Sequence, residues 1–339
     1  MAKSDAAVPA AVTTEGADAA RVPRSIRAGV IGVGYLGAFH AEKLAEDAGA
    51  ELVAVSDIAA DRRREVGGRL GVTACDDYRE LLDSVEAVSI VVPTDLHYGI
   101  ARTCLEHGVH VLVEKPITQT PAEAAELIEL AAARGLVLQV GHLERFNPAI
   151  RALEPMLERP RFVESVRVAP FKERGTEVDV VLDLMIHDID LIQHIVGSPI
   201  ASIEAVGAAV ITRKPDVANA RIRFESGCIA NVTAGRTSLK TERKIRIFQD
   251  TCYVSADLHQ KKLTVHRRGE GVWDSETIPL TVETIDCPRE DALRLEIAAF
   301  LDAVREGKPP PVPGEDGKRA LETALVIVEQ LEAWFRSMR

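Results

Sequence analysis

The sequence has few cysteines and no long apolar segment. Its 339 residues include five scattered cysteines with no C-x-x-C pair, which disfavours a disulfide framework or a cysteine-bound zinc site. No stretch reaches the roughly 18 consecutive apolar residues of a membrane-spanning helix, and the N-terminus has no compact apolar core typical of a signal peptide. We therefore expect a cytoplasmic protein with reduced thiols. The cysteines are Cys75, Cys104, Cys228, Cys252 and Cys287.

Basic residues are outnumbered by acidic ones. The chain has 41 Lys and Arg against 52 Asp and Glu, a net charge of -11. This balance disfavours broad binding to nucleic acid or to anionic membranes, which requires clustered basic residues. An anionic substrate would have to meet local positive charge.

The first half of the chain alternates short apolar runs with helical patterns. After a tail at 1–25, apolar runs at 28–33, 52–56, 87–92, 109–113 and 137–140 predict strands buried on both faces. Thr120-Pro121-Ala122-Glu123 is a capping box that begins a connecting helix, and Gly135 ends that helix. The pattern predicts an α/β fold, with a doubly wound parallel sheet over 26–147.

The second half, 148–339, has a different pattern. Alternating apolar and charged residues at 220–225 predict a mostly antiparallel sheet with one wet face, within an α+β domain. Helical patterns occupy about 180–196, 289–306 and 317–337, and the last of these could pack back on the first domain. We find no internal repeat.

A glycine motif directly follows the first predicted strand. In Gly32-Val33-Gly34-Tyr35-Leu36-Gly37, the glycines have the spacing that allows a tight turn, a close approach to a pyrophosphate, and helix packing. Asp57, followed by Ile58, ends the second strand, where an acid binds the adenosine ribose. The context predicts a Rossmann domain that binds NAD. Arg62 and Arg63 keep NADP open as an alternative, although a solvated helix face also explains them.

Two groups of residues have the chemistry of a catalytic site. Glu114-Lys115-Pro116 follows the fourth predicted strand, at the edge where open α/β sheets bind ligands, so Lys115 could donate to a substrate hydroxyl. Asp183, His187 and Asp190 share one stripe of a predicted helix, and a carboxylate there would orient a histidine base. A surface lysine and a structural histidine are the alternatives. We predict no metal, because hydride transfer to a nicotinamide does not require one.

Two further segments follow predicted strands. Pro93-Thr94 and His97 come after the third strand and could line the cofactor crevice, or His97 could cap the next helix. The segment 141–148 follows the fifth strand and contains Arg145 and Asn147. A guanidinium there would suit a substrate phosphate, and an interdomain ion pair is the alternative.

In this order, these motifs resemble the Gfo/Idh/MocA oxidoreductase family over about residues 27–339. The resemblance implies an open-faced antiparallel sheet, tightly held NAD(H), and dimers or tetramers formed partly through that sheet. It also implies that Lys115 and His187 are the catalytic pair and that Asp183 orients the site. The cofactor site would comprise 32–37, Asp57, Ile58, Pro93, Thr94, His97, Glu114 and Lys115.

Within the family, the segments 141–148 and 181–190 resemble the branch that oxidises the 3-hydroxyl of UDP-N-acetylglucosamine. Arg236-Thr237-Ser238 and the basic run 240–246 fit that branch too. The branch implies a nucleotide-sugar substrate and a partner aminotransferase that makes a diamino sugar for lipid A. Candidate substrate ligands are then Arg145, Asn147, Lys172, Arg174, Asp183, His187 and Arg236. The alternatives are dehydrogenation of an inositol, a simple sugar or a UDP-uronic acid, and a non-catalytic NAD sensor.

Overall fold

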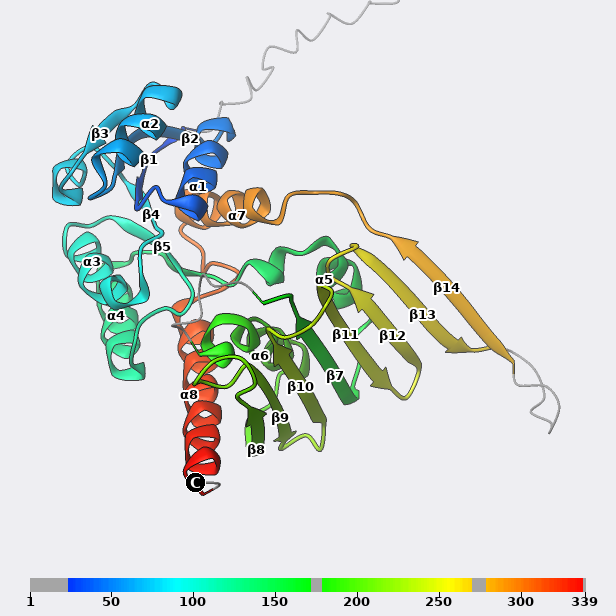
Figure 1. Ribbon diagram of the computed structural model, residues 1–339. Helices are drawn as coiled ribbons and strands as arrows, with labels where there is room; N and C mark the ends of the chain where they lie inside the picture. The colour runs from blue at the N-terminus through cyan, green and yellow to red at the C-terminus, as the bar shows by residue number, and fades with distance from the viewer. Residues whose placement is uncertain (1–23, 172–178, 270–278, 338–339) are drawn as a thin grey trace, which may run out of the picture.

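A computed structural model describes residues 24–171, 179–269 and 279–337. The chain forms two sheets with helices packed against them, and a long C-terminal helix runs alongside both (Figure 1). None of the helices in these ranges is long and apolar enough to cross a membrane.

The first sheet is parallel, in the order β3-β2-β1-β4-β5-β6. The predicted doubly wound sheet is confirmed, and its order changes direction between β1 and β4. The short third strand was not predicted, because three residues are too few for a periodic signal. The strands are β1 Ile26–Ile31, β2 Ala50–Ser56, β3 Thr73–Cys75, β4 Ala87–Ile90, β5 His110–Glu114 and β6 Leu138–Gly141.

Helices cover both faces of this sheet. One face packs against α1 and α7, and the other against α3 and α4. The capping box predicted at Thr120 is confirmed, since Thr120 accepts from the Glu123 backbone and Glu123 accepts from the Thr120 backbone. The helices of this region are α1 Tyr35–Glu46, α2 Ala60–Leu70, α3 Thr94–Glu106 and α4 Pro121–Arg134.

The second sheet has eight strands in the order β14-β13-β12-β11-β7-β10-β9-β8. Every neighbouring pair is antiparallel except β7 and β10, so the predicted mostly antiparallel sheet is confirmed. The strands are β7 Pro160–Val168, β8 Ile200–Ala208, β9 Val217–Phe224, β10 Ile229–Gly235, β11 Glu242–Gln249, β12 Cys252–Asp257, β13 Lys262–Arg268 and β14 Leu280–Asp286.

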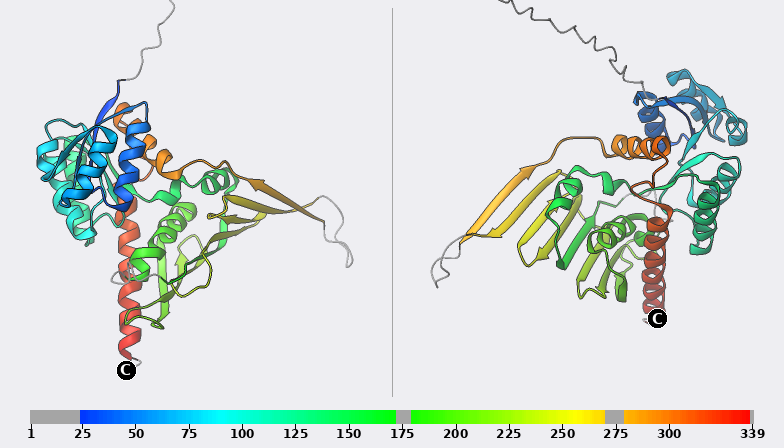
Figure 2. Two further views of the ribbon diagram at one scale, coloured as in Figure 1. Left: turned by 45° about the horizontal axis from the view of Figure 1, so that its top comes forward. Right: turned by 180° about the vertical axis from the view of Figure 1, so that it is seen from behind.

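Helices pack on only one face of the second sheet (Figure 2). These are α5 Pro148–Leu153 and α6 Ile186–Val196, with the π-helical turn η4 Val181–Met185 directly before α6. Along β7 and β11 the covered face is marked by the buried residues Val163, Ser165, Ile245 and Ile247. We call this face the inner face of the second sheet.

The last two helices join the two halves of the molecule. In α7, Ala292–Glu306, the residues Ile297 and Phe300 belong to the core of the first sheet, although the helix follows the second sheet in sequence. In α8, Gly314–Ser337, Leu321 packs with the first core and Ile327 with the second. The predicted helix positions in this region therefore hold to within a few residues, while the division at residue 147 stays a prediction.

Candidate active site

The glycine turn after β1 has the geometry of a dinucleotide-binding loop. Gly32 has φ +86°, and a Cβ there would lie 2.4 Å from the Val91 carbonyl oxygen. A Cβ at Gly37 would lie 1.8 Å from the Gly32 oxygen, so close packing of α1 requires both glycines. Above Gly34 there is open space, with no heavy atom within 4 Å of a Cβ. A phosphate can therefore approach the backbone at the N-terminus of α1.

Asp57 is held beside this turn by two backbone groups. Its Oδ2 accepts from Val33 N and its Oδ1 from Ala59 N, each at 2.8 Å. Next to it, Ile58 is 91% exposed, and Tyr35 on the first turn of α1 is 69% exposed. The arrangement leaves room for an adenosine beside an acidic group, which suits the 2′-hydroxyl of NAD. Arg63 donates to the Asp57 and Ile58 carbonyls, so it braces this loop.

His97 connects two of the predicted cofactor-lining segments. It lies on the first turn of α3, just after Pro93 and Thr94, and its ring nitrogens lie 2.8 Å from the Pro116 carbonyl and 2.9 Å from the Val92 carbonyl. Burial lowers the pKa of His97, although both carbonyls oppose that effect. The imidazole is buried and contacts the loop that carries Lys115.

Lys115 lies where the carboxyl end of β5 meets η4. Its Nζ donates to the Asp183 main-chain carbonyl at 2.8 Å and lies 3.9 Å from Asp183 Oδ1. Burial lowers the pKa of Lys115, and Asp183 and Glu114 partly offset this effect. A buried ammonium with a lowered pKa can give up a proton near neutral pH more readily than a surface lysine.

His187 lies on the first turn of α6, and its Nδ1 is buried without a hydrogen-bond partner. Its pKa is well below the ordinary value, first because of burial and then because of the positive charges of Lys115 and Arg167. The imidazole is therefore neutral at pH 7 and can accept a proton.

The predicted stripe of Asp183, His187 and Asp190 needs correction. Asp183 lies in a π-helical turn, and its carboxylate is near Lys115. Asp190 accepts instead from the Arg145 guanidinium at 2.7 Å. In the described part of the chain no hydrogen bond or ion pair joins either carboxylate to His187. The helical spacing assumed in the prediction is disrupted by the π turn, a feature often found at functional sites.

Two of the predicted substrate ligands have structural partners. The Arg145 guanidinium is buried and pairs with Asp190 and with Asp316 of α8 at 2.8 Å, so the structure contains the ion-pair alternative. The Asn147 amide donates to Glu144 and to the Leu258 carbonyl, and its oxygen caps α5. Arg145 thus joins α6 to α8, and Asn147 joins the start of α5 to the residue after β12, so a role of either toward substrate stays a prediction.

The other predicted ligands have different outcomes. Arg236 directly follows β10 and is buried, and its charge acts on the carboxyl of Asp179. Its role toward substrate stays a prediction. Lys172 and Arg174 lie outside the described residues. The Glu114 carboxylate faces the interior, toward His40, so any contact of this side chain with the cofactor also stays a prediction.

The sequence analysis missed three groups beside the site. His142, after β6, is buried, and neither ring nitrogen has a hydrogen-bond partner among the described residues, although Nδ1 lies 4.0 Å from Asp190 Oδ2. It contributes to the low pKa of His187. Arg167 on β7 is clamped between Glu144 and Asp188, at 2.8 and 2.6 Å. Arg243 lies opposite Arg167 on β11. No sequence pattern indicated Arg167, because its face of β7 is formed by Arg161, Val163, Ser165 and Arg167 and is not an apolar stripe.

The site combines a dinucleotide crevice, a buried lysine at the same edge of the sheet, and a neutral imidazole nearby. This is the arrangement of a dehydrogenase. Such an enzyme needs a hydride acceptor and a proton acceptor at one place. When bound, NAD supplies the hydride acceptor, and residues 32–37 and Asp57 would hold it.

Comparisons with known proteins agree with this class. Residues 26–142 match the model of an oxidoreductase family with an NAD-binding Rossmann fold, and residues 161–254 match the GFO/IDH/MocA C-terminal domain. The UDP-N-acetylglucosamine 3-dehydrogenase of Acidithiobacillus ferrooxidans is 40% identical over 92% of this chain and 99% of that protein. Its solved structure superposes with a TM-score of 0.87, covering 91% of this chain and 98% of that one.

A myo-inositol 2-dehydrogenase of Thermotoga maritima is more distant, with 28% identity over 91% of this chain and 96% of that protein. The chain belongs to the Gfo/Idh/MocA family of NAD-binding oxidoreductases.

Proposed function

We propose that this protein oxidises the 3-hydroxyl of UDP-N-acetylglucosamine with NAD and forms the 3-keto sugar nucleotide. The similar dehydrogenase at 40% identity supports the substrate. The observation in the site that carries the proposal is Arg243, a cation that neighbours the catalytic pair and faces solvent.

Arg243 lies on the inner face of the second sheet, in phase with Ile245 and Ile247. Its side chain is 47% exposed, and within the described ranges its ion-pair partner is Glu144, at 3.5 Å. Arg167, its neighbour on β7, is 4% exposed and saturated by two carboxylates. The positive charge of Arg243 is near enough to contribute to the low pKa of His187. In a chain of net charge -11, this local cation suits the diphosphate of a nucleotide sugar.

The chemistry follows from the protonation states of the pair. The neutral His187 takes the proton of the 3-hydroxyl, and Lys115 donates a hydrogen bond to the same oxygen and stabilises its developing charge. Asp183 holds the ammonium of Lys115 in place through its main-chain carbonyl. This geometry replaces the earlier expectation that Asp183 orients the imidazole.

The test is a coupled assay with purified protein. Reduced nicotinamide should appear with UDP-N-acetylglucosamine and NAD, and it should increase when glutamate and an aminotransferase specific for the 3-keto product remove that product. UDP alone should raise the melting temperature, because it binds the folded protein. Turnover of myo-inositol with no response to UDP would replace the proposal with a polyol dehydrogenase.

The Arg243→Met variant should weaken substrate binding. We expect the KM for the nucleotide sugar to rise about 10-fold or more, because a charge-assisted contact to phosphate contributes roughly 1.5–3 kcal/mol. The KM for NAD should stay unchanged. The matched control is Arg102→Met on α3, an exposed arginine that pairs with Glu106 and lies on neither face of the second sheet. Equal KM values in both variants would remove Arg243 from the substrate site.

We also propose that the protein forms homodimers or homotetramers through the uncovered face of the second sheet. Four rings stack there across β7, β11, β12 and β13, with centroids 4.6–5.5 Å apart: Phe162, Phe248, Tyr253 and His266. On β14, Val282 is 53% exposed. Aromatic rings on an uncovered sheet face are typical of an interface.

A Phe248→Glu variant should therefore reduce the molar mass measured by light scattering to that of a smaller assembly. The control is Leu239→Glu, at a fully exposed position outside the strands, which should leave the mass unchanged. A wild-type monomer would refute this proposal and leave the dehydrogenase proposal untouched. A cytoplasmic location and coupling to the aminotransferase of a lipid A or surface-glycan pathway complete the proposed function.

A further inference from the structure

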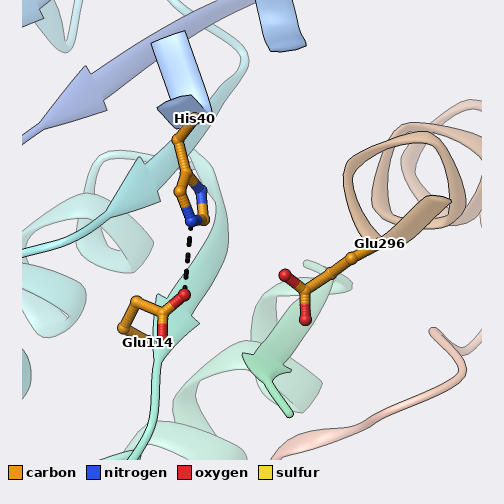
Figure 3. A group of neighbouring side chains, drawn as sticks. All are labelled: His40, Glu114 and Glu296. Carbon is orange, nitrogen blue, oxygen red and sulfur yellow. Dashed lines mark ion pairs between the residues drawn. The ribbon is translucent and has the colours of Figure 1, made fainter. Parts of the chain in front are cut away.

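Behind Lys115, a group of three ionisable side chains is enclosed in the core of the first domain. His40 comes from α1, Glu114 from the end of β5 and Glu296 from α7, and their nearest ligand atoms all lie within 4.8 Å of one another. In Figure 3 the Glu296 carboxyl projects toward the other two side chains. Of these residues, only Glu114 was singled out from the sequence, as part of the predicted cofactor site.

The Glu114 carboxylate has two visible neighbours that can donate. His40 Nε2 lies 3.3 Å from Oε1, and the Lys115 backbone N–H donates to Oε2 at 3.3 Å. On the other side of the ring, His40 Nδ1 lies 2.7 Å from the Ser89 hydroxyl. With its proton on Nε2 the imidazole accepts from Ser89 at Nδ1 and turns Nε2–H toward Glu114, although the 3.3 Å approach there does not have the geometry of a hydrogen bond. Burial works to raise the pKa of Glu114, but His40 and Lys115 hold it below the ordinary value, so Glu114 is an anion.

Glu296 has no such neighbours. Its side chain is completely buried, and neither carboxyl oxygen has a hydrogen-bond partner. A second anion this close to Glu114, with no cation of its own among the described residues, would be very costly. One proton on the pair removes the cost, because only one of the two neighbouring carboxyls then carries a charge.

We propose that Glu114 and Glu296 share a single proton, which is carried on Glu296. The one negative charge behind Lys115 then lies on Glu114, and Glu296 is a positioning residue for that charge. Burial and the charge of Glu114 raise the pKa of Glu296 well above its ordinary value, which agrees with this assignment. Glu296 touches neither substrate nor cofactor, so it acts through Glu114.

This single charge matters for the protonation of Lys115. Glu114 and Asp183 favour its ammonium form, while burial and Arg167 oppose that form. The other ionisable groups beside the amine are His187 and His142, both with lowered pKa values. Removing the charge of Glu114 should therefore lower the pKa of Lys115, whereas removing a neutral acid should leave it unchanged.

The pH profile of kcat/KM tests where the charge lies. If the acid limb reports Lys115, on which Glu114 acts directly, it should move down by roughly one pH unit in Glu114→Gln. It should not move in Glu296→Gln, because a neutral amide replaces a neutral acid. Equal downward shifts in Glu296→Gln and Glu114→Gln would mean that Glu296 is ionised, and would overturn the proposal.

The kinetic test rests on the proposed function. Two other readouts need no substrate, so they remain valid if that function is wrong. The infrared band of a protonated carboxylic acid should be present at pH 7 in the wild type and absent in Glu296→Gln. The melting temperature of Glu296→Gln minus that of the wild type should increase as pH rises above about 4.3, the unfolded-state pKa of Glu. The reason is that a group with a raised folded-state pKa loses its stabilising contribution as pH rises.

A bound metal ion would give the opposite results. Purified wild-type protein would then contain a stoichiometric divalent cation, measured by elemental analysis, and Glu296→Gln would lose the ion and melt at a lower temperature at every pH. That result, or the absence of the infrared band from the wild type, would overturn the shared-proton assignment.

Discussion

Lys115→Met should reduce kcat of the proposed dehydrogenase by about 10²- to 10⁴-fold, the range for loss of a group that transfers or stabilises a proton in the transition state. The methionine fills a similar volume in this buried position but offers no donor to the substrate oxygen. Binding of NAD should persist, because the glycine turn and Asp57 lie on other strands. The measurement is steady-state formation of reduced nicotinamide, together with the rise in melting temperature that NAD produces.

The control for this variant is Lys43→Met on α1, which removes a lysine that is largely covered and pairs with Glu46 and Asp291. Its kcat should equal that of the wild type. A comparison with His187→Asn then separates the two roles. If His187 is the base, Lys115→Met keeps the acid limb of its residual pH profile and His187→Asn loses it. Full activity of Lys115→Met with NAD bound would remove Lys115 from the chemistry.

Arg167→Met should cost about 3–5 kcal/mol in the free energy of unfolding, because it leaves two buried carboxylates without their cation. The Arg167 guanidinium lies between Glu144 and Asp188 and is 4% exposed. The matched control lies on the same strand: Arg161 pairs with Asp250 at the surface, so Arg161→Met should cost about 1 kcal/mol or less. Urea unfolding of the three proteins measures the difference.

The cost of Arg167→Met should depend on pH. Burial works to raise the pKa of Glu144, but Arg167 and Asn147 hold it below the ordinary value. A carboxyl with a lowered folded-state pKa stabilises the protein above its unfolded-state pKa, about 4.3, and this contribution is lost as pH falls through the folded-state value. The gap between wild type and variant should therefore narrow as pH falls below about 4.3. A gap that is constant with pH would indicate lost packing instead of lost charge.

The features that could be predicted from the residue order are those made by neighbours in sequence. The glycine turn needs only Gly32, Gly34 and Gly37 at their spacing, and the cap at Thr120 needs only Glu123 three residues later. Lys115 could be placed at a ligand-binding edge because the carboxyl ends of parallel strands share one edge. The family resemblance added the pairing of Lys115 with His187, which no local pattern contains.

The features that could not be predicted concern side chains with several possible partners. The Arg145 guanidinium suits a phosphate and a carboxylate equally well. Its partners are determined by helix packing, because α8 brings Asp316 and α6 brings Asp190 close to it. The stripe at 183–190 assumed regular α-helical spacing, and the π turn moved Asp183 toward Lys115. Both outcomes depend on packing between distant segments.

Local order along the chain thus determines the cofactor loop, the two kinds of sheet and the position of the lysine, because hydrogen bonding and side-chain periodicity act over a few residues. Tertiary structure alone determines the electrostatics of the site. Glu296 reaches Glu114 because α7 folds back on the first sheet, and Arg243 lies beside Arg167 because β11 pairs with β7. Charge interactions depend on distance and burial in space, and neither can be obtained from the separation of residues along the chain.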